Sequence, residues 1–98
     1  MTVWKFVIDA YQPHSQLNGY HKVCMPMESK LLFVAEQDDK LIVWAVVNTT
    51  RSMVDRQFRV CGTGEELQNI ANWDYVGTVM RRNGLVTHVF VLGDSNGL

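Results

Sequence analysis

The chain has 98 residues, of which 47% are hydrophobic and 19% are charged, and this ordinary globular composition argues against disorder. The formal net charge of −1 argues against general nucleic-acid binding, because proteins of that class carry a basic surface. No apolar run reaches membrane-spanning length and no signal segment opens the chain, so we expect a cytoplasmic protein without a membrane partner.

We expect a single β-rich domain over residues 1–98, which is long enough for one modest hydrophobic core. Cys24 and Cys61 are too few and too far apart for a zinc motif or a redox pair. We therefore expect two reduced, partly buried thiols, no metal and no cofactor.

Three segments follow one another in the first part of the chain. Residues 1–8 alternate in the manner of a strand, and residues 9–19, which are rich in proline, asparagine, serine and glycine, predict a loop. Residues 20–25 predict a second, short strand that stops at Pro26.

A hairpin is predicted next, with strands over residues 30–37 and 40–47 joined through residues 38–39. A two-residue and a four-residue connection give the same pairing, in which Phe33 faces Trp44. An aromatic pair across two strands is a favourable contact.

Residues 55–61 alternate well enough for a further strand. The turn Gly62–Gly64 then leads into the only helix that the sequence predicts. Thr63 and Glu66 have the spacing of a capping box, and an apolar stripe of helical period runs on to Trp73. This helix has two turns at most.

Near the C-terminus, Asn83–Gly84 is flanked by two β-rich runs, which is the strongest short-range signal for a hairpin. A two-residue loop places Val79 opposite His88 and Gly77 opposite Phe90, so that the ring covers the glycine. Eight residues then share one face: Tyr75, Gly77, Val79, Arg81, Val86, His88, Phe90 and Leu92. Neither face is plainly polar, so we expect the hairpin to lie between two layers or against a partner subunit.

Together these segments predict a mainly β fold. It has about seven antiparallel strands and one short helix, arranged as a small sandwich or a partly open barrel.

The most suggestive candidate site is the glycine turn with Arg59 just before it. Glycines let backbone amides approach an anion, and a following helix N-terminus favours phosphate. The spacings of a Walker loop or a dinucleotide fingerprint are absent, so a plain strand-to-helix turn is the alternative. The candidate ligand-binding residues are Arg59, Gly62, Thr63, Gly64, Arg81, Arg82, His88 and Tyr75.

The hairpin supplies the other candidates. His88 could donate to a ligand or act as a base, but no second histidine, cysteine or carboxylate is visibly paired with it, so a half-buried structural histidine is the alternative. Arg81 and Arg82 could clamp phosphate together with Arg59, or form a solvated hairpin tip. No nucleophile, metal set or carboxylate pair supports an enzyme.

Six short motifs follow one another along the chain: Trp4-Lys5-Phe6, Met25-Pro26, Trp44-Ala45-Val46-Val47, Arg59-Val60-Cys61-Gly62-Thr63-Gly64, Tyr75-Val76-Gly77-Thr78 and His88-Val89-Phe90. This ordered set resembles a family of small bacteriophage and prophage proteins known only as a domain of unknown function. The resemblance covers residues 4–90. It implies a phage-encoded protein in the host bacterial cytoplasm and supplies no catalytic residues. The chain departs from the pattern at Cys61, where an aromatic residue is common, and in its longer loop over residues 9–19.

We therefore expect a non-enzymatic binding protein that counteracts or modulates a host antiviral-defence process by sequestering a small anionic or nucleotide ligand. The alternative is a protein–protein module, either an inhibitor of a host enzyme or a virion accessory subunit. The expected partners are this ligand, a host protein and further copies of the chain in a homo-oligomer.

Overall fold

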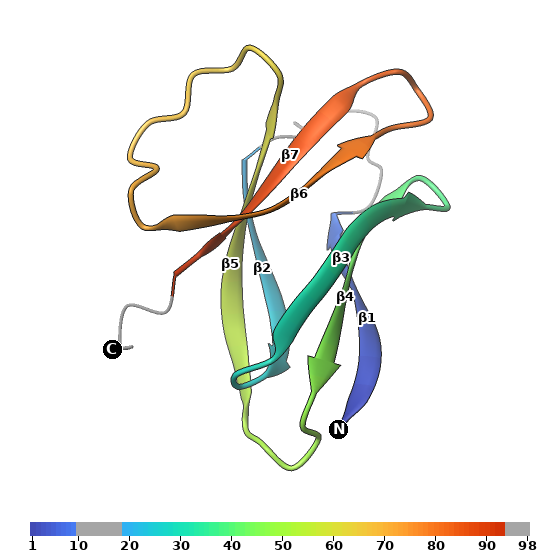
Figure 1. The fold of residues 1–98 in the computed structure, drawn as a ribbon, viewed down its shortest axis with the longest axis vertical. Coiled ribbons are helices and arrows are strands. Elements are labelled where there is room, and N and C mark those ends of the chain that lie inside the picture. The colour runs from blue at the N-terminus through green and yellow to red at the C-terminus, as the bar shows by residue number, and fades with distance from the viewer. Residues whose placement is uncertain (10–18, 94–98) are drawn as a thin grey trace.

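The computed structural model describes residues 1–9 and 19–93, and within them the protein is all β. There are seven strands: β1 (Thr2–Asp9), β2 (Gly19–Pro26), β3 (Lys30–Gln37), β4 (Lys40–Val47), β5 (Met53–Gly62), β6 (Trp73–Met80) and β7 (Val86–Leu92). They form two antiparallel sheets, one of three strands in the order β1-β4-β3 and one of four strands in the order β2-β5-β7-β6. Figure 1 shows both sheets.

The two sheets pack in a sandwich-like arrangement, which confirms the expected β fold. The described strands do not close into a barrel. The sheets approach one another at two borders, where β3 lies against β6 and β1 lies against β2. The predicted loop over residues 9–19 falls largely outside the described residues. None of the described segments is a helix that could span a membrane.

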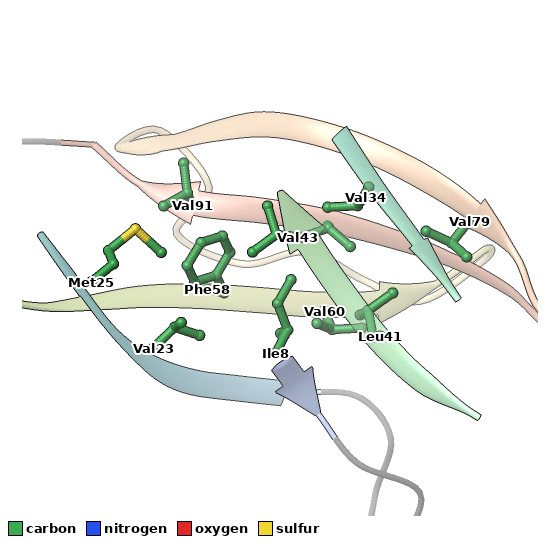
Figure 2. Close-up of a cluster of buried hydrophobic side chains, with 11 residues drawn as sticks. Ile8, Val23, Met25, Val34, Leu41, Val43, Phe58, Val60, Val79 and Val91 are labelled. Carbon is green, nitrogen blue, oxygen red and sulfur yellow. The ribbon is translucent and has the colours of Figure 1, made fainter. Parts of the chain in front are cut away.

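The hydrophobic core lies between the inner faces of the two sheets, as Figure 2 shows. Phe58 on β5 is its largest fully buried side chain, and Met25 and Val43 lie on either side of it. Alternation along each strand explains this core, because every second residue points to the opposite sheet. The same alternation leaves two outer faces, one on each sheet.

The β3–β4 hairpin has the predicted pairing. Phe33 faces Trp44, and their ring centroids are 6.4 Å apart. The connection has two residues, Asp38 and Asp39, whose φ angles are 53° and 63°. Two consecutive positive φ angles are typical of a type I′ turn, which matches the twist of the strands it joins.

The predicted register of the β6–β7 hairpin is wrong by one residue. Val79 faces Thr87, not His88, and Gly77 faces Val89, not Phe90. The N–H of Gly84 donates to the carbonyl of Arg81 at 2.9 Å, and Gly84 has a φ of 90°. These features describe a three-residue loop, a tight turn followed by a glycine bulge, rather than a two-residue one.

This shift moves side chains to the other face of the sheet, because strand residues alternate. Arg81 lies on the inner face with Val79, whereas His88 and Phe90 lie on the outer face. A second irregularity, between Tyr75 and Gly77, places Tyr75 opposite Phe90. The eight residues expected on one face are therefore divided between two.

Gly77 is required by the opposite sheet. A Cβ built at this position would lie 2.6 Å from Cγ2 of Val34 on β3, which is closer than two carbon atoms can pack. The predicted role of Gly77, as backbone covered by Phe90, is therefore wrong. The absence of a side chain lets β6 approach β3.

We predict that Gly77→Ala lowers the free energy of unfolding by about 1–3 kcal/mol, the usual cost of an overpacked core. Urea unfolding measures it. Val34→Ala should recover part of the loss in the double variant Gly77→Ala/Val34→Ala, because it removes the clashing methyl group. Additive losses in the double variant would contradict this explanation.

The predicted short helix after Gly64 is absent, since residues 63–72 form turns, a bend and irregular segments. Asn69 has a φ of 56°, a left-handed conformation that interrupts a right-handed helix. The carboxylate that accepts a backbone hydrogen bond is that of Glu65, which binds the N–H of Gly62 at 2.6 Å. The capping-box spacing at Thr63 and Glu66 is therefore not used.

Candidate functional site

The outer face of the four-stranded sheet carries a row of four side chains, one from each strand. Tyr20 on β2 faces Arg59 on β5, Arg59 faces Phe90 on β7, and Phe90 faces Tyr75 on β6. The rings of Tyr75 and Phe90 meet edge to face, with centroids 5.7 Å apart. Tyr20 and Tyr75, at the two ends of the row, are both 62% exposed.

Arg59 is enclosed by its neighbours on this face. Its guanidinium carbon lies 5.2 Å from the ring centroid of Tyr20 and 5.8 Å from that of Trp73, within the range of cation–π attraction. One guanidinium N–H donates to the carbonyl of Gln68 at 2.6 Å. Arg59 is only 8% exposed, so it fixes the segment after β5 against the sheet and is not open to a ligand in this conformation.

A second group of side chains on the same face forms a chain of polar contacts. Oγ1 of Thr63 lies 2.7 Å from Nε2 of His88, and Nδ1 of His88 lies 3.0 Å from Oγ1 of Thr78. The hydroxyl of Tyr75 lies 2.5 Å from the same Thr78 oxygen. Both nitrogens of His88 are thus engaged, and the imidazole and the phenol ring are held in fixed positions.

A pocket of 440 Å³ adjoins this chain of contacts where β5 ends. The turn after β5 contributes Gly62, Thr63 and Glu65, and the β6–β7 hairpin contributes the rest. The hairpin residues are Arg81, Gly84, Leu85, Val86 and Thr87. Thr63 belongs both to the pocket wall and to the chain of contacts that leads to Tyr75, so this chain links the pocket to the outer face, although His88, Thr78 and Tyr75 do not themselves line the pocket.

The arginines of the hairpin have different environments. Nε of Arg81 donates to Oε1 of Glu36 on β3 at 2.6 Å, and both side chains are almost fully buried. Nη1 of Arg81 is buried and has no hydrogen-bond partner. Arg82 is exposed, and only its backbone N–H reaches Glu36, at 3.2 Å. Its guanidinium forms no ion pair within the described part of the chain.

Two acidic groups influence the charge around the pocket. Burial raises the pKa of the Glu36 carboxyl, but the hydrogen bonds and charges of Arg81 and Arg82 outweigh it, and the net pKa is below the usual value. Glu36 is therefore ionised at neutral pH and balances Arg81. The Glu65 carboxylate occupies the N–H of Gly62, which an incoming anion would otherwise use.

The two cysteines are free thiols, and they differ in exposure. Cys24 is exposed, contrary to the expectation of partial burial, whereas Cys61 is buried. Burial and the nearby Glu65 raise the pKa of the Cys61 thiol, although Arg59 acts in the opposite direction. Cys61 is thus a protonated, packed thiol with poor nucleophilicity. No group of three or more metal-ligating side chains exists among residues 1–9 and 19–93.

The structure thus brings together several of the predicted site residues, but not all of them. Gly62, Thr63 and Arg81 line one pocket, and His88 and Tyr75 connect to it through hydroxyl contacts. Arg59, in contrast, is enclosed on the outer face of the sheet, Arg81 is tied to Glu36 between the sheets, and Arg82 lies at the hairpin tip. The three arginines therefore do not form a common phosphate clamp. Gly64, exposed in the turn with a φ of 90°, is not part of the pocket wall.

Comparison with known proteins places the chain in a family. Residues 1–97 match the family described as "Domain of unknown function (DUF7352)". The chain belongs to this family. No curated protein and no solved structure matches it. The description of DUF7352 names no activity. The candidate site of this chain is therefore inferred from the chain's own geometry.

Sequence reasoning missed two side chains on the outer face of the four-stranded sheet. Thr78 links Tyr75 to His88, and Tyr20 closes over Arg59, yet neither was a candidate. The correct hairpin register would have placed Thr78 directly opposite His88 and indicated the first contact. Nothing in the sequence indicated the contact between Tyr20 and Arg59, because β2 and β5 are far apart in the chain and their pairing could not be predicted.

Proposed function

We propose that the protein is a non-enzymatic binding protein that captures a small ligand with a planar ring, of the nucleotide class, at the pocket and the adjoining outer face. The observation that carries this proposal is the chain of side-chain contacts that links the pocket to the outer face. Thr63 in the pocket wall contacts His88, and His88 connects through Thr78 to the exposed ring of Tyr75.

The shape and the lining of the site support a ligand of this size. A pocket of 440 Å³ lies within the range of roughly 300–1,000 Å³ that small-molecule sites occupy. The exposed ring of Tyr75 offers a stacking surface for a base, held in place by its edge contact with Phe90. Leu85 and Val86 supply apolar contact in the pocket wall.

The charges favour a ligand with limited negative charge. Arg81 is balanced by Glu36, and Glu65 lies in the pocket wall. The exposed guanidinium of Arg82, at the hairpin tip and outside the pocket wall, is the cation that the hairpin offers to a phosphate. An anion that reaches the glycine turn must displace the Glu65 carboxylate from the Gly62 N–H. A nucleoside monophosphate or a cyclic nucleotide fits this balance better than a triphosphate.

The resemblance to phage proteins supports the biological setting of the proposal, which is a host bacterial cytoplasm in which the captured ligand belongs to an antiviral-defence process. No catalytic step is included. Both nitrogens of His88 face threonine hydroxyls, and within the described residues no carboxylate is positioned to orient it as a base.

A protein–protein module is the second candidate function, and it has its own supporting observation. Large apolar side chains are exposed on the outer face of the three-stranded sheet, with Phe33 64% and Val3 53% exposed. Exposed apolar clusters of this kind are typical of interaction surfaces. As a protein–protein module, an inhibitor of a host enzyme or a virion subunit would present that face to its partner.

We predict that Tyr75→Ala weakens nucleotide binding roughly 5- to 150-fold, because stacking on an aromatic ring contributes about 1–3 kcal/mol per base. Isothermal titration calorimetry measures the dissociation constant, for the nucleotide that gives the largest thermal shift in a panel of nucleoside monophosphates and cyclic mono- and dinucleotides.

Two further variants separate stacking from other effects. Tyr75→Phe keeps the ring and loses only the hydroxyl contact with Thr78, so it should retain most of the affinity. Tyr20→Ala removes an equally exposed tyrosine from the same sheet face, at the other end of the row, and serves as the matched control. Equal losses for Tyr20→Ala and Tyr75→Ala, or no thermal shift with any member of the panel, would contradict the proposed function.

A further inference from the structure

We infer that Asn83 is a covalent modification site, at which the side-chain amide is lost by reaction with the backbone nitrogen of Gly84, and that the folded β6–β7 hairpin holds this reaction back. The reaction is a deamidation, and its co-reactant is water. Asn83 and Gly84 are both exposed in the three-residue loop that joins the two strands. The inference does not depend on the proposed ligand, although Gly84 also lies in the pocket wall.

The residue that follows Asn83 makes its amide reactive. Ring closure brings the backbone nitrogen of the following residue onto Cγ of the asparagine, and a side chain on that residue would hinder the approach. Gly84 has no side chain, and beyond its chain neighbours no heavy atom lies within 4 Å of the position that a Cβ would take. Glycine also has the widest range of backbone conformations, so an open loop reaches the geometry of ring closure readily.

The reaction balances with water alone. The nitrogen of Gly84 gives its proton to a solvent base and attacks Cγ of Asn83. The Cγ–Nδ2 bond breaks, and Nδ2 takes up a proton and leaves as ammonia. The five-membered succinimide that remains then adds one water molecule. Opening at Cγ gives aspartate, whereas opening at the main-chain carbonyl carbon gives isoaspartate, in which the main chain runs through Cβ and Cγ and is one atom longer. Either product is a carboxylate and carries a negative charge at neutral pH.

In the folded hairpin, hydrogen bonds hold both reacting groups. The N–H of Gly84 donates to the carbonyl of Arg81 at 2.9 Å, so the nucleophile keeps its proton. The side-chain carbonyl of Asn83 accepts the N–H of Leu85, also at 2.9 Å. Ring closure requires the Gly84 nitrogen to leave its acceptor and the Asn83 side chain to turn toward it, so both bonds must break. The reaction therefore proceeds from the fraction of chains in which the loop is open.

The two products have different effects on the hairpin. Aspartate keeps a side-chain oxygen for the N–H of Leu85, so the loop persists with an added negative charge next to Arg82. Isoaspartate lengthens the main chain within a loop whose length sets the strand register. This product therefore disturbs the loop that places Gly84 and Leu85 in the pocket wall.

Peptide mapping by mass spectrometry tests the inference on the full chain, incubated at mildly alkaline pH either folded or in guanidinium chloride. The sequence supplies a matched control, because Asn18–Gly19 and Asn96–Gly97 repeat the same dipeptide. In the unfolded chain, Asn83 should lose its amide at a rate similar to those of Asn18 and Asn96. In the folded chain, Asn83 should react at least about tenfold more slowly than in the unfolded one, which corresponds to a free energy of loop opening of about 1.4 kcal/mol or more.

Two results would overturn the inference. If folded and unfolded chains lose the Asn83 amide at the same rate, the hairpin gives no protection. If the Asn83 amide persists in guanidinium chloride while Asn18 and Asn96 lose theirs, Asn83 is not a reactive site. The variant Asn83→Asp, digested in the same way, provides the reference peptide that distinguishes the aspartate product from isoaspartate. Circular dichroism confirms that the sample without denaturant stays folded during the incubation.

Discussion

Arg81→Met should lower the free energy of unfolding by about 3–5 kcal/mol at pH 7, the cost of leaving a buried charge without its partner. In the folded protein, Arg81 and Glu36 form an ion pair with an N–O distance of 2.6 Å, and the two side chains are 4% and 8% exposed. The pair joins the residue that follows β6 to β3 and therefore fastens the two sheets together. Urea unfolding monitored by circular dichroism measures the loss.

A double variant separates the cost of an unpaired charge from the value of the pair. Arg81→Met/Glu36→Leu replaces both partners with apolar groups and should recover most or all of the loss, because well-packed apolar residues often stabilise as much as a buried ion pair. A double variant as unstable as Arg81→Met would contradict this account. Arg81→Lys keeps the charge and should be intermediate, since it loses the fixed geometry of the guanidinium.

The same pair predicts how stability depends on pH. The pKa of Glu36 is lower in the folded than in the unfolded protein, so its contribution is fully present above the unfolded value of about 4.3. That contribution is lost as the pH falls through the folded pKa. In Glu36→Gln, this part of the acid-side loss of stability should be absent.

Phe58→Ala should also destabilise the protein by about 3–5 kcal/mol, through the loss of a fully buried ring and the cavity that remains. Phe58 lies on β5 at the centre of the core between the sheets, as Figure 2 shows, and is 0% exposed. A loss of this size is a large fraction of the stability of a domain of this length. The midpoint of urea or thermal unfolding measures it.

The matched control for Phe58→Ala is Met80→Ala, which removes a large apolar side chain that is 78% exposed. This variant should change the stability by less than about 0.5 kcal/mol. A loss for Phe58→Ala no greater than that for Met80→Ala would contradict the position of the core between the two sheets.

The two hairpins show how much of the fold could be predicted from the sequence. For β3–β4, both possible loop lengths gave one register, so the alternation of apolar residues was sufficient. For β6–β7, the Asn83–Gly84 pair predicted a two-residue loop, but the same pair also fits the three-residue loop that forms, which shifts the register by one residue. The register that forms places Arg81 against Glu36, which is 45 positions away in the chain. The residues that neighbour Arg81 in the sequence do not predict this contact.

The candidate site was predictable to a similar degree. The glycine turn and the hairpin were chosen for their local chemistry, and the structure places Gly62, Thr63 and Arg81 around one pocket. The roles of the arginines were not predictable. Whether a guanidinium is enclosed, as that of Arg59 is, or paired between sheets depends on strands that are distant in sequence.

Native mass spectrometry of the purified protein with the nucleotide panel tests the central claim most directly, because it reports bound ligand and stoichiometry together. Ligand capture at Tyr75 and the adjoining pocket predicts a mass increase of one nucleotide per chain. That increase should be lost or much reduced in Tyr75→Ala and retained in Tyr20→Ala. No added mass with any nucleotide, or equal retention in both variants, would contradict the claim.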